Sequence, residues 1–343
     1  MEHMEIRQVA TGLISIPPNG WGAIERIIWE YKKNLETLGH TVEIIGIDQV
    51  GGDKLHHVHV ANLALHCRDN NIPYVFSLHD HHVEWYGKGS WVYNQNLEAI
   101  KGSVISFAHA EHLIDYFDET DKLFYLPHGA DVNFFEPALD PPAEHRLMML
   151  ANNGGAGDST YDRKGFRYGI EAAKELDLPI TVVGTDNILL FFAANRDLLE
   201  YKKLTLIANN PDDLTVKRLF QEHTIFLHPS NLEAGHPNLT LLEAASCCLP
   251  VVGTFKGSKC VPGMYILPEI SVAAVVRGVQ YVSDIYGKLR DEMFEKRHQH
   301  DWLNVCKILE RYYTNVLKVK EDYTTEKTKA LYIKAYNETV KYV

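Results

Sequence analysis

The sequence predicts an α/β fold of two domains, each built around a parallel sheet. Short apolar runs that read as strands alternate with segments of helical period along most of the chain, which is the pattern of a parallel sheet covered by helices. The length of 343 residues suits two domains of about 150–180 residues each. A polar, proline-rich segment at 137–142 marks the expected boundary between them.

The first domain is expected to open with a strand, a loop, a helix and a second strand. Residues 5–12 read as the first strand and residues 14–22 as a loop rich in proline and glycine. Residues 23–38 place apolar side chains on one helical stripe, and Gly39 ends this helix. Residues 41–47 then form the second strand. Further strands are expected at 56–60, 72–78, 104–108 and 123–126, with helices at 61–67 and 111–117.

The second domain repeats the same alternation. Its strands are expected at 146–151, 180–184, 204–208, 224–228, 251–253 and 264–267, with helices at 167–176, 214–222 and through 271–318. The final segment, 323–343, also has helical spacing. Sequential strands joined by helices form right-handed parallel units, so each domain should have its own sheet.

The composition limits the classes of function. Hydrophobic residues make up 45% and charged residues 23% of the chain, as in ordinary soluble globular proteins. The net charge of −11 argues against a general nucleic-acid surface. No apolar run approaches the roughly 18–20 residues that span a bilayer, and no signal peptide is evident. The five cysteines form no CxxC pair, so we expect reduced thiols in a cytoplasmic protein.

The stretch 228–252 has the clearest pattern for ligand binding. An apolar strand ends at His228, a polar turn follows, and a helix begins that Asn238 or Thr240 could cap. Backbone N–H groups at such a helix start form an anion site. Glu233 precedes the helix and Glu243 lies on it. A phosphate at the helix end and a carboxylate for ribose hydroxyls together favour a nucleotide.

The order of several motifs resembles that of the retaining GT-B glycosyltransferases of the family 4-like group (glycosyl transferases group 1). These motifs are PPNGWGAIE at 17–25, PHGADVNFFEP at 127–137, Lys164–Gly165, and PSNLE followed by LLEAASCCLPVV within 229–252. The resemblance implies two Rossmann-like domains facing each other across a cleft. The acceptor-side domain would span 1–138 and the nucleotide-sugar domain 139–318, and a C-terminal helix at 319–343 would pack back on the first domain.

The activity that this resemblance implies is transfer of a sugar, with retention of configuration, from a nucleoside-diphosphate sugar to a hydroxyl acceptor. The donor would be UDP- or GDP-linked, and neither a cofactor nor a divalent metal would be needed. The acceptor stays open among a saccharide, a lipid-linked molecule, a small molecule and a modified nucleobase.

The resemblance also carries roles to individual residues. Glu243 matches the family's ribose-binding glutamate, and Glu233 would lie beside the donor sugar although it is ten residues away instead of eight. Lys164 would hold the diphosphate, and Arg163 would replace an arginine that the motif places earlier. The catalytic candidates are His79, Lys164 and Glu233. The donor-binding candidates are Gly22, Arg163, Lys164, Gly235, His236, Pro237, Asn238, Leu239, Thr240 and Glu243. The acceptor-side candidates are Trp21, His81 and His82.

Three alternatives stay open at this point. The unusual glutamate spacing and the missing arginine are compatible with a GT-B-like protein that binds a sugar or nucleotide with weakened catalysis. The run from His79 to His82 contains ligands that suit Zn²⁺, which would indicate a metal-dependent hydrolase, although one HxH pair supplies too few ligands. His79 is also compatible with a buried structural role. The fragment GAGDST at 155–160 lacks the third glycine of a dinucleotide fingerprint.

Overall fold

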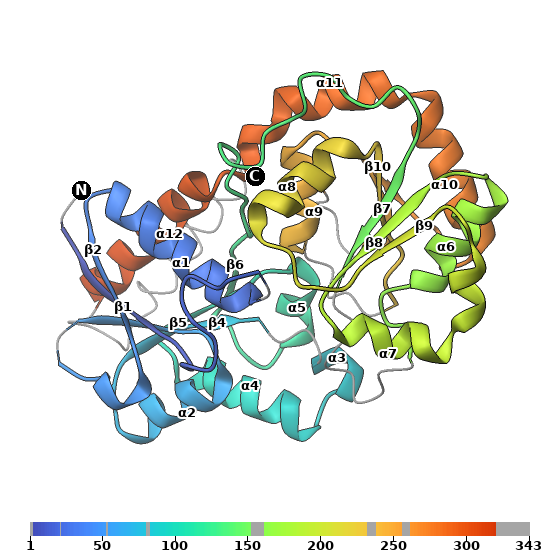
Figure 1. Cartoon of the computed structure of the whole chain (residues 1–343). Helices are drawn as coiled ribbons and strands as arrows, with labels where there is room; N and C mark the ends of the chain where they lie inside the picture. Colours follow the sequence, from blue (N-terminus) through green and yellow to red (C-terminus); the bar gives the residue numbers. More distant parts are fainter. Residues whose placement is uncertain are drawn as a thin grey trace.

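Two parallel sheets of six strands each form within the described part of the computed structural model (Figure 1). That part comprises residues 3–20, 22–52, 54–79, 83–151, 161–231, 238–255 and 261–319. Helices cover both faces of each sheet, and the apolar side chains between the layers form four clusters. The predicted α/β fold of two Rossmann-like domains is therefore confirmed.

The first sheet has the strand order β2-β1-β3-β4-β5-β6, and its neighbouring strands are parallel. Its central strands are buried along their whole length, because helices exclude water from both faces. The strands are β1 (Glu5–Val9), β2 (Thr41–Ile45), β3 (Leu55–Val58), β4 (Tyr74–Leu78), β5 (Ile105–Ala108) and β6 (Leu123–Tyr125).

One face of this sheet is covered by α1 (Ala23–Thr37), whose buried stripe includes Ile27, Tyr31 and Leu35. The stripe has the spacing expected from the sequence. The opposite face is covered by α2 and α4, and their side chains pack around Tyr74 and Phe76 of β4. The further elements of this half are η1 (Ile47–Gln49), α2 (Ala61–Asp69), α3 (Val83–Tyr86), α4 (Trp91–Gly102) and α5 (Glu111–Tyr116).

The second sheet has the strand order β12-β11-β10-β7-β8-β9, again parallel throughout. Helices α6, α7 and α10 pack on one face, and α8, α9 and α11 pack on the other. No described helix has both the length and the apolar character needed to cross a membrane. The strands are β7 (Leu147–Leu150), β8 (Ile180–Val183), β9 (Leu204–Ile207), β10 (Ile225–His228), β11 (Val251–Gly253) and β12 (Met264–Ile266). The helices are α6 (Phe166–Glu175), α7 (Asn187–Ala194), η2 (Arg196–Glu200), α8 (Asp213–Glu222), α9 (Leu239–Ser246), α10 (Val272–Asp284), α11 (Tyr286–Lys296) and η3 (Arg297–His300).

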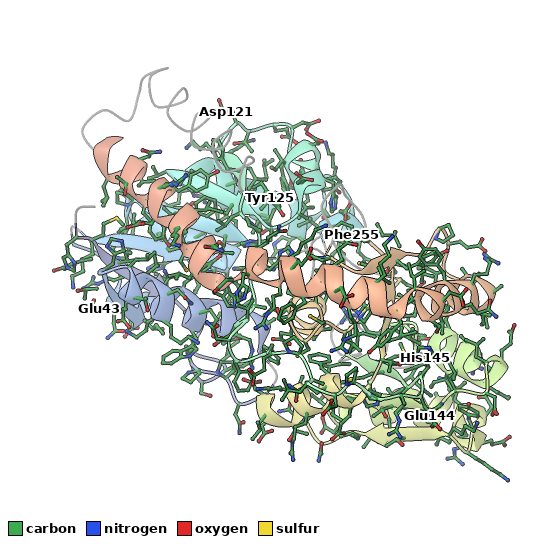
Figure 2. The ribbon with its side chains drawn as sticks, turned by 90° about the horizontal axis from the view of Figure 1, so that it is seen from above. Glu43, Asp121, Tyr125, Glu144, His145 and Phe255 are labelled. Carbon is green, nitrogen blue, oxygen red and sulfur yellow. The ribbon has the colours of Figure 1, made fainter. Side chains whose placement is uncertain are left out.

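The chain returns to the first domain near its C-terminal end, as expected, but the return begins earlier than position 319. Helix α12 (Trp302–Val319) packs beside α1 and buries Trp302, Tyr312 and Tyr313 in the core of the first sheet. Figure 2 shows this ribbon running from the second domain, where His145 is labelled, toward the first, where Glu43 is labelled. Residues 320–343, which we expected to make the crossing, lie outside the described residues.

The two passages between the domains lie side by side. The outgoing segment pairs with the returning one, because Ala130 N donates to His300 O (2.8 Å) and Trp302 N donates to Ala130 O (3.2 Å). A Cβ added at Gly129 would meet the Trp302 ring at 2.8 Å, so only glycine lets the two passages approach this closely. This pairing fixes where one domain is attached to the other.

Candidate functional site

A cavity of about 160 Å³ lies between the two domains. The second domain lines it with Ala151 and Gly184, which directly follow β7 and β8. The carboxyl ends of parallel strands are where open α/β sheets bind their ligands. The first domain contributes Gly20, Gly22 and Ala23 at the start of α1, together with Arg26. The cavity is therefore built jointly by both domains, as ligand sites often are.

An ion pair joins the domains across this cavity. Arg26 of α1 donates from Nη1 to Asp213 Oδ2 (2.6 Å) and from Nη2 to Asp213 Oδ1 (2.7 Å) on α8. The guanidinium also donates to Gly20 O at 3.3 Å. Such a two-point pair fixes both distance and orientation. The loop before α1 is thereby held against the second domain, and both partners line the cavity.

Glu243 lines the same cavity from α9, as the ribose-binding hypothesis requires. Its side chain is buried, and burial raises the pKa of this carboxyl to about 7, an effect that the positive charge of Arg26 opposes. The neighbouring carboxylates of Asp213 and Glu30 act in the same direction as burial. A buried acid next to a cavity is typical of functional sites, because burying a carboxyl group costs stability that packing alone seldom compensates.

The start of α9 also lines the cavity, through Leu239 and Thr240. Asn238 occupies the position before the helix, as expected, but no hydrogen bond from its side chain caps the helix. Its amide Nδ2 lies 3.1 Å from His228 Nε2 instead. The first turn of α9 therefore faces the cavity, with Glu243 one turn further along the helix.

The Lys164–Gly165 motif is joined to the segment that follows β10. Gly165 has a left-handed backbone (φ 74°), and a Cβ there would lie 2.1 Å from Pro229 O. Asn231 N and Ser230 Oγ donate to Arg163 O at 2.8 and 3.1 Å. Two of the motifs that the sequence singled out thus lie against each other. Arg163 is buried and Lys164 half-buried, and neither is among the described residues that line the cavity.

The loop at α6 is also fixed by its own helix. Asp162 accepts at Oδ1 from Phe166 N (2.8 Å) and at Oδ2 from Arg167 N (2.9 Å). These are two of the backbone donors that a helix start leaves without a partner in the helix. The carboxylate of Asp162 was not singled out in the sequence, because the usual capping signal is the residue directly before the helix, and that position is occupied by Gly165.

His79 follows β4 directly, as expected, but its surroundings differ from the prediction. Its ring belongs to a series of buried and half-buried histidines at the carboxyl edge of the first sheet, and His79 is not among the described residues that line the cavity. We call His57, His59, His79, His109 and His128 the histidine column. Whether His79 acts in turnover stays a prediction.

The sequence contains a signal for this column that we did not recognise. His59 follows β3, His79 follows β4 and His109 follows β5 directly, and His128 lies three residues after β6. Because these four strands are neighbours in the sheet, their carboxyl ends bring the rings together. Histidine follows each of these four strands within three residues, and this repetition was the available clue.

Several predicted site residues lie outside the described residues. They are Trp21, His81, His82, Glu233, Gly235, His236 and Pro237. The roles assigned to them stay predictions. Among the described candidates, the structure brings Gly22, Leu239, Thr240 and Glu243 to one cavity, and it adds Arg26 and Asp213, which the sequence alone did not indicate.

Comparison with known proteins finds no matching family model and no matching curated protein. Solved structures do match. A glycosyltransferase from Rickettsia africae has 18% identity and a TM-score of 0.65, covering 93% of this chain and 100% of its own. HepE from Anabaena, in complex with UDP and glucose, has 13% identity and a TM-score of 0.68, covering 91% and 100%.

The catalytic domain of starch synthase IV from Arabidopsis thaliana, bound to ADP and acarbose, also matches. It has 12% identity and a TM-score of 0.65, and the alignment covers 92% of this chain and 99% of that domain. All three matches extend over both sheets, because each covers more than nine tenths of the chain. The chain therefore has the two-domain GT-B fold that these glycosyltransferases share.

Proposed function

We propose that the protein is a glycosyltransferase that transfers a sugar from a nucleoside-diphosphate sugar to a hydroxyl acceptor. The observation that carries the proposal is the buried Glu243 at a cavity that both domains build, beside the strand ends of the second sheet. Neighbours of the same fold bind UDP with glucose, or ADP with acarbose. Those ligands are of the class that a ribose-binding carboxylate beside a helix start would suit.

The groups that line the cavity, together with Lys164 from the loop before α6, divide the donor between them. The Glu243 carboxylate accepts hydrogen bonds from the ribose hydroxyls, and the start of α9 directs backbone N–H groups toward the diphosphate. Arg26 supplies positive charge next to Glu243, provided that the incoming phosphate competes with Asp213 for the guanidinium. Lys164 adds a second positive charge that stabilises the departing diphosphate.

We propose further that transfer proceeds with retention and without a divalent metal. Lys164, Arg26 and the α9 start together offset the charge that a metal ion would otherwise neutralise. Glu233 would lie beside the sugar, and His79, at the carboxyl end of β4, would face the cleft between the domains. The acceptor would enter from the first domain, where Trp21, His81 and His82 are the candidates.

The test is a donor panel in the presence of EDTA. UDP-, GDP- and ADP-sugars are incubated with the protein and a range of hydroxyl acceptors, and release of nucleoside diphosphate is followed. We expect release from one donor class, and NMR of the product shows whether the anomeric configuration is kept. Release that stops with EDTA and returns with Mn²⁺ would contradict metal independence, and no release from any donor would contradict the proposed transferase.

A matched pair of variants tests whether Lys164 stabilises the charge on the leaving group. Lys164→Ala should lower kcat by about 100-fold, the scale of removing one group that stabilises developing charge. Lys174→Ala removes an exposed lysine from the other end of the same helix and should leave kcat unchanged. Equal kcat in the two variants would remove Lys164 from the mechanism.

A further inference from the structure

The histidine column lies at the carboxyl edge of the first sheet, and none of its five residues is among the described residues that line the cavity beside Glu243. Neighbouring ring centroids are 4.3 Å apart for His57 and His59, 5.3 Å for His59 and His79, 4.6 Å for His79 and His109, and 4.1 Å for His109 and His128. One nitrogen of each of His79, His109 and His128 lies within 4.8 Å of the other two. Three imidazoles on neighbouring strand ends form a set of metal ligands.

The hydrogen bonds behind His79 fix which of its nitrogens carries the proton. Gln8 Oε1 accepts from His59 Nε2 at 2.6 Å, so the other nitrogen of a neutral His59 is an acceptor. His59 Nδ1 therefore accepts from His79 Nε2 at 3.0 Å. His79 Nδ1 is left with the lone pair that can bind a metal.

His109 is fixed in the same way. Its Nδ1 lies 2.8 Å from Leu126 O, and a carbonyl oxygen only accepts, so Nδ1 carries the proton. In a neutral ring the lone pair is then on Nε2. A histidine that binds a metal nearly always donates its second N–H to a carbonyl or a similar acceptor. Both His79 and His109 have this arrangement before any metal binds.

We propose that His79, His109 and His128 bind a divalent transition-metal ion of the Zn²⁺ type at the carboxyl edge of the first sheet. Zn–N bonds of about 2.0–2.1 Å place tetrahedral ligand nitrogens about 3.4 Å apart. The set closes by movements of about 1 Å and by rotation of the rings, which now lie within 12° and 26° of parallel. Three protein ligands leave a fourth position for water or a substrate atom.

Direct binding measurements test the site without any assay of sugar transfer. The protein is treated with a chelator, dialysed and titrated with Co²⁺, which reports its geometry through visible absorption, and then with Zn²⁺ in competition. We expect one ion per chain and a tetrahedral Co²⁺ spectrum that Zn²⁺ abolishes. X-ray absorption of the Zn²⁺ form should show three imidazole nitrogens at about 2.0 Å. No saturable binding, or a shell without imidazole, would overturn the proposal.

Variants locate the site. His79→Asn, His109→Asn and His128→Asn should each weaken Co²⁺ binding at least 100-fold, since loss of even a supporting outer group costs 10–100-fold. His79 is the least buried of the three, so its variant is the one chosen should the others fail to fold. His112→Asn is the matched control, because His112 lies in the same domain and pairs with Glu84 outside the column. Binding that survives in His79→Asn would place the ion elsewhere and overturn the assignment.

Discussion

The carboxyl edges of the two sheets differ in what occupies them. At the first sheet, stacked histidines fill the edge with the protein's own side chains, and His59 forms hydrogen bonds with both His79 and Gln8. At the second sheet, the edge opens into a cavity where Glu243, Arg26 and Asp213 are the charged groups. The same strand–helix architecture therefore yields one edge packed with histidine rings and one edge open to a charged ligand.

The two edges should also respond to pH with opposite sign. Burial lowers the pKa of His57 to about 3 and raises the pKa of Glu243 to about 7, and in both cases the neutral form is favoured. A falling pH therefore lowers the stability of the fold through His57. Through Glu243 it raises the stability, as the pH falls from about 7 to the ordinary range of a carboxyl group. Burial at each edge therefore favours the neutral form of the side chain, and hydrogen bonds from a ligand would favour the charged form of Glu243.

The largest expected effect comes from His57. Its folded pKa lies below its unfolded value, so the unfolded chain binds more protons and stability is lost as the pH falls from about 6.5 to about 3. The contribution reaches about 1.4 kcal/mol per pH unit, or about 4–5 kcal/mol over the whole window. Urea unfolding between pH 8 and pH 4 measures it, and His57→Asn should have the shallower slope.

The groups that face His57 include Tyr31, Tyr313, His59, Ser77 and Phe107, and the nearby His109 also lowers its pKa. The control is His66→Asn, because His66 is exposed on α2 and meets solvent in both states. Its slope should match that of wild type. If His57→Asn and wild type lose stability at the same rate with falling pH, burial does not hold His57 neutral. The opposite pH responses expected for the two edges would then be contradicted at the first sheet.

The next effect concerns the close approach at Gly165. Gly165→Ala should lower the free energy of unfolding by about 2–4 kcal/mol, because a left-handed residue with a Cβ costs about 1 kcal/mol and overpacking adds about 1–3. The new methyl group would clash with Pro229 O. Gly39→Ala is the matched control, since Gly39 also has positive φ but nothing within 4 Å of the added atom. Equal losses of unfolding free energy in the two variants would show that the loop moves to accommodate the added methyl group.

A smaller effect is expected from the ion pair between the domains. Asp213→Ala should lower the free energy of unfolding by about 1–3 kcal/mol, the range for hydrogen bonds to charged groups. The substitution removes the carboxylate that faces the largely buried guanidinium of Arg26. Asp197→Ala removes a similar two-point pair with Arg167 (2.7 and 3.1 Å) that is more exposed and lies within one domain. We expect about 0.2–1 kcal/mol for that pair. Urea unfolding of both variants compares them, and a larger loss for Asp197→Ala would contradict the bridging role.

Much of the fold could be predicted from the sequence, because apolar runs and helical stripes are local signals. The stripe of α1 and the strand ending at His228 are examples. Helix α7 was not assigned, since residues 187–194 are apolar almost throughout and show no period. The return to the first domain was placed too late. The apolar stripe that begins at Trp302 predicts that one face of this helix is buried, but it does not indicate which of the two sheets covers that face.

The candidate site was predictable only in part, for a similar reason. Glu243 lies within a recognisable local motif, and the structure places it at the cavity. Arg26 and Asp213 are 187 residues apart, and no local pattern pairs them. The histidine column depends on the strand order of the first sheet, which the sequence does not state. Interactions that depend on which elements become neighbours were therefore the ones missed.

Nucleotide affinity tests most directly whether Glu243, at the open edge of the second sheet, binds the ribose of the donor. Isothermal titration with UDP, GDP and ADP at pH 8, in EDTA, keeps the Glu243 carboxylate largely ionised, since its pKa is about 7. Glu310→Gln is the control, because Glu310 is also buried but pairs with His40 in the first domain. We predict that one nucleotide binds wild type and Glu310→Gln alike. Glu243→Gln should raise its Kd about 5- to 30-fold, or about 1–2 kcal/mol; equal affinity in all three proteins, or no binding of any nucleotide, would contradict the account.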